Sequence, residues 1–175
     1  FIEGEEEAGS ESFLNFLKEN QRDLEADLII VADSGNWSTE VPSLTASLRG
    51  VVSQVFTVKT LDHALHSGMY GGPLPDAMTA MIKLLATLTD GAGDVAISGL
   101  VSDQTNGPDV SLEQLREESG LLPGVDRMGT KPVTQQIWGE PAVTIIGFDA
   151  PSVAVSSNTA LPEITARVSL RLAPS

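Results

Sequence analysis

The chain has 175 residues, enough for one sizeable hydrophobic core and too few for an enzyme of several lobes. Hydrophobic residues make up 41% of it, and no apolar run approaches the roughly 20 residues that a membrane-spanning helix needs. Its 24 acidic and 10 basic side chains give a net charge of −14, which repels phosphate backbones and anionic lipid surfaces. We therefore expect a soluble globular protein without nucleic acid or membrane partners.

The chain contains no cysteine. Disulfides and thiolate metal sites are therefore excluded, and the composition fits a reducing compartment, so we expect a cytoplasmic protein. The N-terminal residues 1–7 lack an initiator methionine and the basic-then-apolar pattern of a signal peptide. This start predicts that the chain is a segment of a longer protein.

The first part of the chain has the pattern of a βαβ unit. Residues 1–45 carry a net charge of −9, against −5 for residues 46–175, which suggests two parts of different origin. Residues 1–3 resemble the end of a strand, and residues 13–24 place apolar side chains at helical spacing. Residues 28–32 form an unbroken apolar run, which is typical of a parallel strand covered on both faces.

The second part has the pattern of a sheet covered by helices on one face. Strands are predicted near residues 48–61, 95–100, 142–148 and 164–172, and the last of these alternates apolar and polar side chains. Two helices are predicted, one capped by Asp76 and one by Ser111. The fold class is therefore predicted as α+β: a two-layer sandwich of a four-stranded antiparallel sheet with two helices on one face, preceded by the βαβ remnant.

Acidic side chains follow both predicted strands of the first part. Glu6 and Glu7 follow the first strand, and Asp33 directly follows the second, so a right-handed crossover would bring them to one sheet edge. Crowded carboxylates are unfavourable without a cation, which favours a divalent metal site with one glutamate free to accept a proton from metal-bound water. The alternative is that acidic residues simply stabilise the start of the helix near Ser10 through its dipole.

The only two histidines, His63 and His66, are three residues apart. That spacing shares a face on a helix but not on a strand, and the glycines after Ser67 argue against a helix. We therefore do not predict a His-x-x-His zinc site. His66 lies on a loop of small residues, where an imidazole can reach a ligand, although an ordinary surface histidine is the alternative.

Four motifs occur in an order that resembles a known enzyme family. The motifs are Glu3 to Ser10, Ala32 to Trp37, His66 to Gly72 and Thr159 to Pro174. They resemble those of the dinuclear zinc metallopeptidases and amidohydrolases, which include carnosinase-type dipeptidases, aminoacylases, acetylornithine deacetylase, succinyl-diaminopimelate desuccinylase and carboxypeptidase G. The resemblance covers nearly the whole chain, and its His-Ser-Gly loop followed by Gly-Gly points to the dipeptidase branch.

The resemblance implies a parent protein of two domains with two zinc ions as its cofactor. Residues 1–45 would be the C-terminal part of the first segment of the catalytic domain, and residues 46–175 the lid, which also forms the interface of a homodimer. Glu6 would be the general base, and Glu7 and Asp33 would each be a zinc ligand. The substrate would be a dipeptide or an N-acyl amino acid, whose amide is attacked by metal-bound water.

The resemblance also implies substrate-binding residues in the lid. His66 would reach into the active site of the other subunit and stabilise the oxyanion that develops on the scissile carbonyl. Arg171 would pair with a substrate carboxylate, and Thr159 matches a second substrate-binding position.

The chain departs from the family pattern at the metal. The family's first zinc-binding histidine, its bridging aspartate and its last histidine ligand have no counterpart here, and two protein ligands do not hold a dinuclear centre. We therefore expect the chain alone to bind zinc weakly and to hydrolyse nothing. The alternative hypothesis is a non-catalytic α+β module for binding or dimerisation.

Overall fold

The structure is a computed structural model that describes residues 1–31, 33–105 and 107–174. The chain divides into two compact units, Phe1–Thr45 and Ala46–Ser175. Among the described residues, no helix has both the length and the apolar character needed to cross a membrane.

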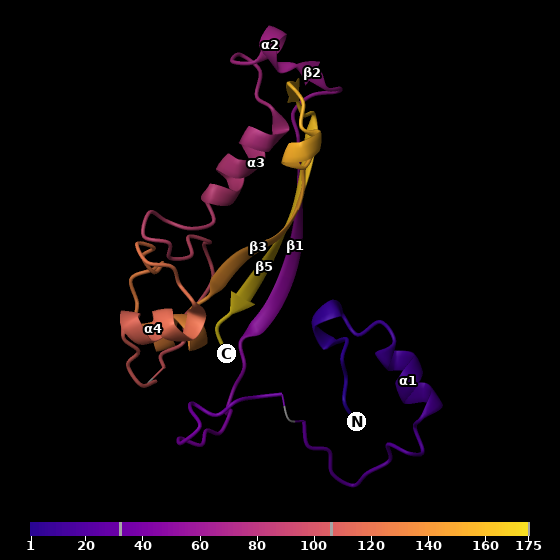
Figure 1. Cartoon of the computed structure of the whole chain (residues 1–175), viewed down its shortest axis with the longest axis vertical. Coiled ribbons are helices and arrows are strands. Elements are labelled where there is room, and N and C mark those ends of the chain that lie inside the picture. The colour runs from indigo at the N-terminus through magenta and orange to yellow at the C-terminus, as the bar shows by residue number, and fades with distance from the viewer. Residues whose placement is uncertain (32, 106, 175) are drawn as a thin grey trace. The chain divides into compact units, whose positions relative to one another are not determined.

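A three-stranded antiparallel sheet forms the centre of the larger unit. Its strands are β1 (Gly50–Lys59), β3 (Ala142–Asp149) and β5 (Glu163–Leu172), in the spatial order β1-β5-β3. Figure 1 shows these long strands side by side, with β5 between the other two. Val168 of β5 lies opposite Gln54 on one side and Ile145 on the other. The β-branched and aromatic side chains of β1 favour this extended pairing.

Helix α3 (Ala77–Ala86) covers one face of this sheet. The strand β5 alternates as predicted, with buried apolar side chains separated by half-buried or exposed polar ones. The core joins three side chains from each element: Ala77, Met81 and Leu85 of α3, and Ile164, Ala166 and Val168 of β5. The predicted α+β class, with a helix layer packed on a sheet layer, is confirmed.

The carboxylate of Asp76 caps the N-terminus of α3, as predicted. Its Oδ1 accepts a hydrogen bond from the backbone N–H of Thr79, at 2.9 Å. That bond satisfies one of the amide groups that a helix start leaves without an intrahelical partner. It also favours the ionised form, and so lowers the pKa of Asp76 below its ordinary value of 3.8.

Replacing Asp76 with alanine is expected to lower the free energy of unfolding by about 1 kcal/mol at neutral pH. Because the folded-state pKa is depressed, this stabilisation is present above the unfolded pKa and is lost as pH falls through the folded pKa. Chemical denaturation at several pH values measures the difference. Asp76→Asn is the matched control, because asparagine caps a helix without titrating. A loss in Asp76→Ala that does not change with pH, or no loss at all, would show that the ionised cap is not the source.

The sheet of the larger unit differs from the predicted one in strand number. Four strands were expected in one sheet, but the described residues form three, and a separate two-stranded sheet pairs β2 (Leu65–His66) with β4 (Thr159–Ala160). The predicted strand at residues 95–100 is wrong, since only an isolated bridge forms there, between Thr89 and Val95. Gly93, just before this segment, and Gly99, within it, both have positive φ and interrupt extended pairing.

The remaining elements are short helices. Helix α4 (Leu112–Ser119) has the predicted Ser111 cap, whose hydroxyl accepts from the N–H of Gln114 at 3.1 Å, and it ends at Gly120 in a left-handed conformation. The other short helices of this unit are α2 (Ser67–Tyr70), α5 (Val133–Trp138) and the 3-10 turn η2 (Val153–Val155).

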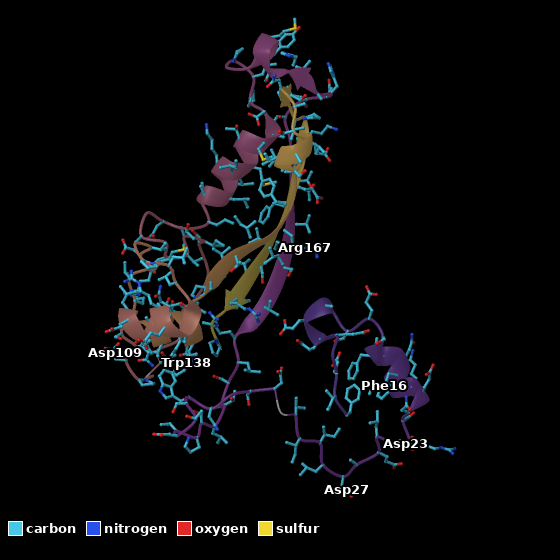
Figure 2. All side chains as sticks on the ribbon, in the orientation of Figure 1. Phe16, Asp23, Asp27, Asp109, Trp138 and Arg167 are labelled. Atoms are coloured by element: carbon cyan, nitrogen blue, oxygen red, sulfur yellow. The ribbon has the colours of Figure 1, made fainter. Side chains whose placement is uncertain are left out.

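The smaller unit contains helix but no strand among its described residues. It has the 3-10 turn η1 (Glu6–Ala8) and helix α1 (Phe13–Glu19). The ring of Phe1 stacks on that of Phe16, with centroids 4.8 Å apart; Phe16 is labelled in Figure 2. The βαβ unit is therefore not formed. Residues 28–31 pair with no other strand and are exposed, with Ile30 83% exposed. Ala32 lies outside the described residues.

The missing strands have a physical explanation. A parallel strand needs a neighbour for its backbone hydrogen bonds and helices over both faces. The described residues of 1–45 supply neither to residues 28–31.

Candidate functional site

His66 and Thr159 face each other in the small sheet. The antiparallel register of β2 and β4 places His66 directly opposite Thr159. Side chains of directly opposed residues in such a pair have Cβ atoms about 4.5–5.5 Å apart. His66 is exposed and Thr159 is half-buried, so both can contact one group of a bound molecule. The structure thus brings together two of the residues assigned to substrate binding.

Backbone hydrogen bonds hold the segment that carries His66. The N–H of Ser67 donates to the carbonyl of Asn158 at 2.9 Å, and the N–H of Gly71 donates to the carbonyl of Ser67 at 2.7 Å. The imidazole Nδ1 of His66 accepts a hydrogen bond from the N–H of Gly68 at 3.0 Å, and this bond caps the N-terminus of α2. The histidine is therefore fixed at both its backbone and its ring.

The end of the larger unit that carries His66 and Thr159, here called the tip, is joined to the core. The N–H of Ala77, at the start of α3, donates to the carbonyl of Leu161 at 3.0 Å, and the N–H of Thr60 donates to the carbonyl of Pro162 at 2.9 Å. These bonds connect the ends of β1, β4 and α3. The segment that follows Thr159 is thus hydrogen-bonded to Ala77, which is buried in the core.

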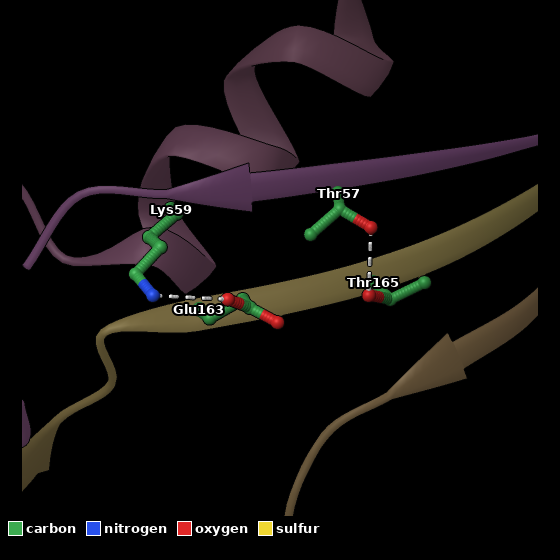
Figure 3. A network of polar contacts seen from close by, with 4 residues as sticks. All are labelled: Thr57, Lys59, Glu163 and Thr165. Carbon is green, nitrogen blue, oxygen red and sulfur yellow. Dashed lines mark hydrogen bonds and ion pairs between the residues drawn. The ribbon is translucent and has the colours of Figure 1, made fainter. Parts of the chain in front are cut away.

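Arg171 lies on the open face of the main sheet, as the alternation of β5 predicts. It is exposed, and it lies opposite Val51 of β1 and Ala142 of β3. Polar pairs continue along this face toward the other end of β5, where the hydroxyls of Thr57 and Thr165 are 3.0 Å apart (Figure 3).

Beyond this threonine pair, Lys59 Nζ and Glu163 Oε2 are 3.6 Å apart (Figure 3). Both side chains are at least half exposed, so this ion pair contributes little stability. It does neutralise the two charges at that end of the strand. Among the described residues it is the one ion pair, so Arg171 has no carboxylate partner.

Arg49 is a second cation near Arg171, and sequence reasoning missed it. Its Nη1 donates to the carbonyl oxygens of Gln136 and Glu140, both at 3.4 Å. Burial lowers the pKa of Arg49, and repulsion from the Arg171 guanidinium lowers it further. An anion bound between the two guanidinium groups would relieve this repulsion. The proximity of Arg49 and Arg171 follows from the strand register. Val51 pairs with Arg171, and Arg49 is two residues before Val51 and so on the same side of the strand.

Arg171 lies far from His66 and Thr159. Figure 1 shows β2 and α2 at one end of the larger unit and the C-terminal end of β5 at the other. Strands advance about 3.3 Å per residue, so Arg171 is roughly 25 Å beyond Glu163, where β5 begins. An extended dipeptide spans only about 7 Å. One copy of the chain therefore cannot place all three side chains on one dipeptide.

The acidic motif near the N-terminus forms a turn. Glu6 and Glu7 are exposed residues of η1, and Asp33 is exposed beyond the described end of the apolar run. The carboxylate engaged here is that of Glu5, whose Oε2 accepts from the N–H and the hydroxyl of Ser12 at 3.2 and 2.6 Å. The hydroxyl bond, with the amide bond adding to it, lowers the pKa of Glu5.

The expected convergence of Glu6, Glu7 and Asp33 is not formed. Across the described ranges, no group of three or more histidine, cysteine, aspartate or glutamate side chains is placed to hold a metal ion. The convergence requires two parallel strands that end at one sheet edge, and neither predicted strand exists in residues 1–31. The residues present do not by themselves fit a catalytic zinc ion, which usually takes three protein ligands.

Comparison with known proteins identifies the larger unit. Residues 47–175 match the family model of the M20 peptidase dimerisation domain. The chain is 34% identical, over 98% of its length, to the cysteinylglycine-S-conjugate dipeptidase of Corynebacterium striatum, and it covers 38% of that protein. It is 29% identical, over 99% of its length, to the beta-Ala-His dipeptidase of Homo sapiens, and covers 36% of it. The chain therefore spans less than two fifths of these relatives.

Solved structures confirm the fold. The di-peptidase Dug1p of Saccharomyces cerevisiae matches 99% of the chain with a TM-score of 0.70 and 24% identity, and the chain covers 39% of that structure. Human carnosine dipeptidase 1 matches 99% of the chain with a TM-score of 0.68 and 25% identity, and 39% of that structure is covered. The resemblance inferred from the four motifs is confirmed. Because the family model spans most of the sequence, the chain belongs to the M20 peptidases through their dimerisation domain.

Proposed function

We propose that this chain is part of a metal-dependent dipeptidase or deacylase that hydrolyses an amide bond, and that it supplies the lid and dimer interface of that enzyme. The match of residues 47–175 to the dimerisation domain carries this proposal. The relatives that align over nearly the whole chain are dipeptidases, which supports a dipeptide as the substrate and an N-acyl amino acid as a close variant of it.

We assign residues 1–45 to the end of the first catalytic segment and residues 46–175 to the lid. Two observations support the boundary. The division of the sequence into two compact units falls between Thr45 and Ala46, and the family model begins at residue 47. The catalytic part is then largely supplied by regions of the whole protein that the chain does not include, in keeping with the 38% of the bacterial relative that it covers.

Substrate binding in this proposal uses two copies of the lid. His66 and Thr159 of one copy contact the scissile amide, with His66 donating to its developing oxyanion. Arg171 of the other copy pairs with the substrate carboxylate. The distance along β5 supports the division between copies, and the unpaired charges of Arg49 and Arg171 support an anion at the second position. The enzyme would therefore be a homodimer.

The proposed catalytic residue of this chain is Glu6, as a proton acceptor, with Glu7 and Asp33 as ligands of zinc. The family motifs support these roles, and the word metallodipeptidase in the names of several relatives supports a metal. Zinc would polarise the water and carbonyl that react. The remaining ligands would come from the rest of the whole protein, so the chain alone should be inactive. The absence of cysteine supports a cytoplasmic location.

Dipeptide hydrolysis by the full-length protein tests this function. We expect a chelator to abolish hydrolysis and added zinc to restore it. Glu6→Gln should lower kcat by about 10²- to 10⁴-fold, because it removes the proton acceptor and keeps the shape. Glu11→Gln, at a nearby exposed acid, is the control and should retain activity. Hydrolysis that is indifferent to chelation, or full activity in Glu6→Gln, would refute the proposed chemistry.

A further inference from the structure

We propose that the backbone amide of Gly68 fixes the tautomer of His66, so that Nε2 carries the imidazole proton and serves as the hydrogen-bond donor to substrate. This inference rests on the proposed function, in which His66 contacts the scissile carbonyl. Its structural basis is the 3.0 Å hydrogen bond from the Gly68 N–H to His66 Nδ1. A ring nitrogen that accepts an N–H must present a lone pair, so the proton of the neutral ring lies on the other nitrogen.

The local backbone is built for this contact. His66 has an extended conformation, with φ −68° and ψ 120°, and the chain turns directly into α2, which brings the amide of Gly68 under the ring. A Cβ atom at Gly68 would lie 2.9 Å from Cε1 and 3.1 Å from Nδ1 of His66. Any larger residue at position 68 would therefore push the ring off the amide. Glycine is therefore required here because of the close approach of the ring, and not because of its backbone conformation, which is helical.

The opposite side of the ring remains available. His66 is exposed, and among the described residues no protein group bonds to its Nε2. The partner strand places Thr159 beside it, so the free N–H and the threonine hydroxyl lie at the same tip. The hydroxyl of Thr159 is 2.7 Å from that of Ser157, which restrains its rotation.

The fixed tautomer has a chemical consequence. An imidazole in solution exchanges its proton between both nitrogens, and only the form with hydrogen on Nε2, or the cation, can donate from that atom. The Gly68 contact thus places the proton of the neutral ring on Nε2 before substrate arrives, and a donor fixed in advance is the condition for effective oxyanion stabilisation.

Nitrogen NMR of the labelled chain tests the inference without any assay of activity. We expect His66 Nδ1 to have the chemical shift of an unprotonated ring nitrogen and Nε2 that of a protonated one, with a scalar coupling between Nδ1 and the amide nitrogen of Gly68. His63 is the internal control, because no described group donates to its ring. His63→Gln assigns the two signals.

A second variant makes the result specific to the contact. Gly68→Ala should abolish the coupling and shift the His66 signals toward the averaged pattern of His63, while the amide signals of α3 and β5 show that the fold is kept. If wild-type His66 shows averaged signals and no coupling, the inference is overturned even where His66→Ala inactivates the full-length enzyme. If the coupling is present but His66→Ala leaves hydrolysis intact, the tautomer stands and its proposed use in catalysis fails.

Discussion

Met81→Ala is expected to lower the free energy of unfolding of this chain by about 2–5 kcal/mol. Met81 is 0% exposed and lies at the centre of the α3 face that packs on β5. Removing its side chain loses apolar burial and leaves a cavity that the sheet beneath cannot fill. Chemical denaturation followed by circular dichroism measures the loss, which should appear as a lower midpoint without a change in slope.

Ile82→Ala is the matched control for this change. Ile82 follows Met81 in the same helix but is 55% exposed, so its removal should cost less than about 1 kcal/mol. Equal losses for the two variants would mean that α3 does not pack on the sheet through Met81. The comparison therefore tests the orientation of the helix as well as the core.

The parts of the fold that local signals specify were predictable from the sequence. The alternation along β5 identifies its buried face, because side chains on a strand repeat every two residues. The caps at Asp76 and Ser111 identify two helix starts, because a carboxylate or hydroxyl there satisfies an amide three residues on. In each case the physical cause and the pattern involve the same few residues.

The elements that depend on distant partners were not predictable. Residues 28–31 have the composition of a buried strand, but a strand exists only where another supplies hydrogen bonds. Helix α5 was missed for the opposite reason, since its β-branched and aromatic residues are poor helix formers. The side chain of Gln135 stabilises it, because its amide oxygen accepts from the Thr105 N–H and its amide nitrogen donates to the Asp103 carbonyl.

The candidate site divides in the same way. The motifs single out His66, Thr159 and Arg171 as residue types, but only the strand register shows that the first two are neighbours. The same register shows Arg171 at the far end of β5 and places Arg49 near it. Sequence spacing contains no information on either distance, because both arise from antiparallel pairing between segments far apart in the chain.

Replacing either His66 or Arg171, which lie at opposite ends of the larger unit, is expected to impair the full-length enzyme. His66→Ala should lower kcat by about 10²- to 10³-fold, because in the proposed function it removes a donor that acts in the transition state. Arg171→Ala should lower kcat/KM by roughly 10- to 150-fold, which corresponds to the 1.5–3 kcal/mol of a hydrogen bond to a charged group. Steady-state hydrolysis of a dipeptide measures both. His63→Ala is the control and should retain full activity.

In the proposed enzyme, His66 of one copy and Arg171 of the other complete each active site. Heterodimers purified through two different tags test it directly. A dimer of His66→Ala with Arg171→Ala contains one intact site and should have about half of wild-type activity. A dimer of wild type with the double variant contains none and should be nearly inactive. The reverse result, with the first dimer inactive and the second half active, would place both residues in the site of a single copy and contradict the account.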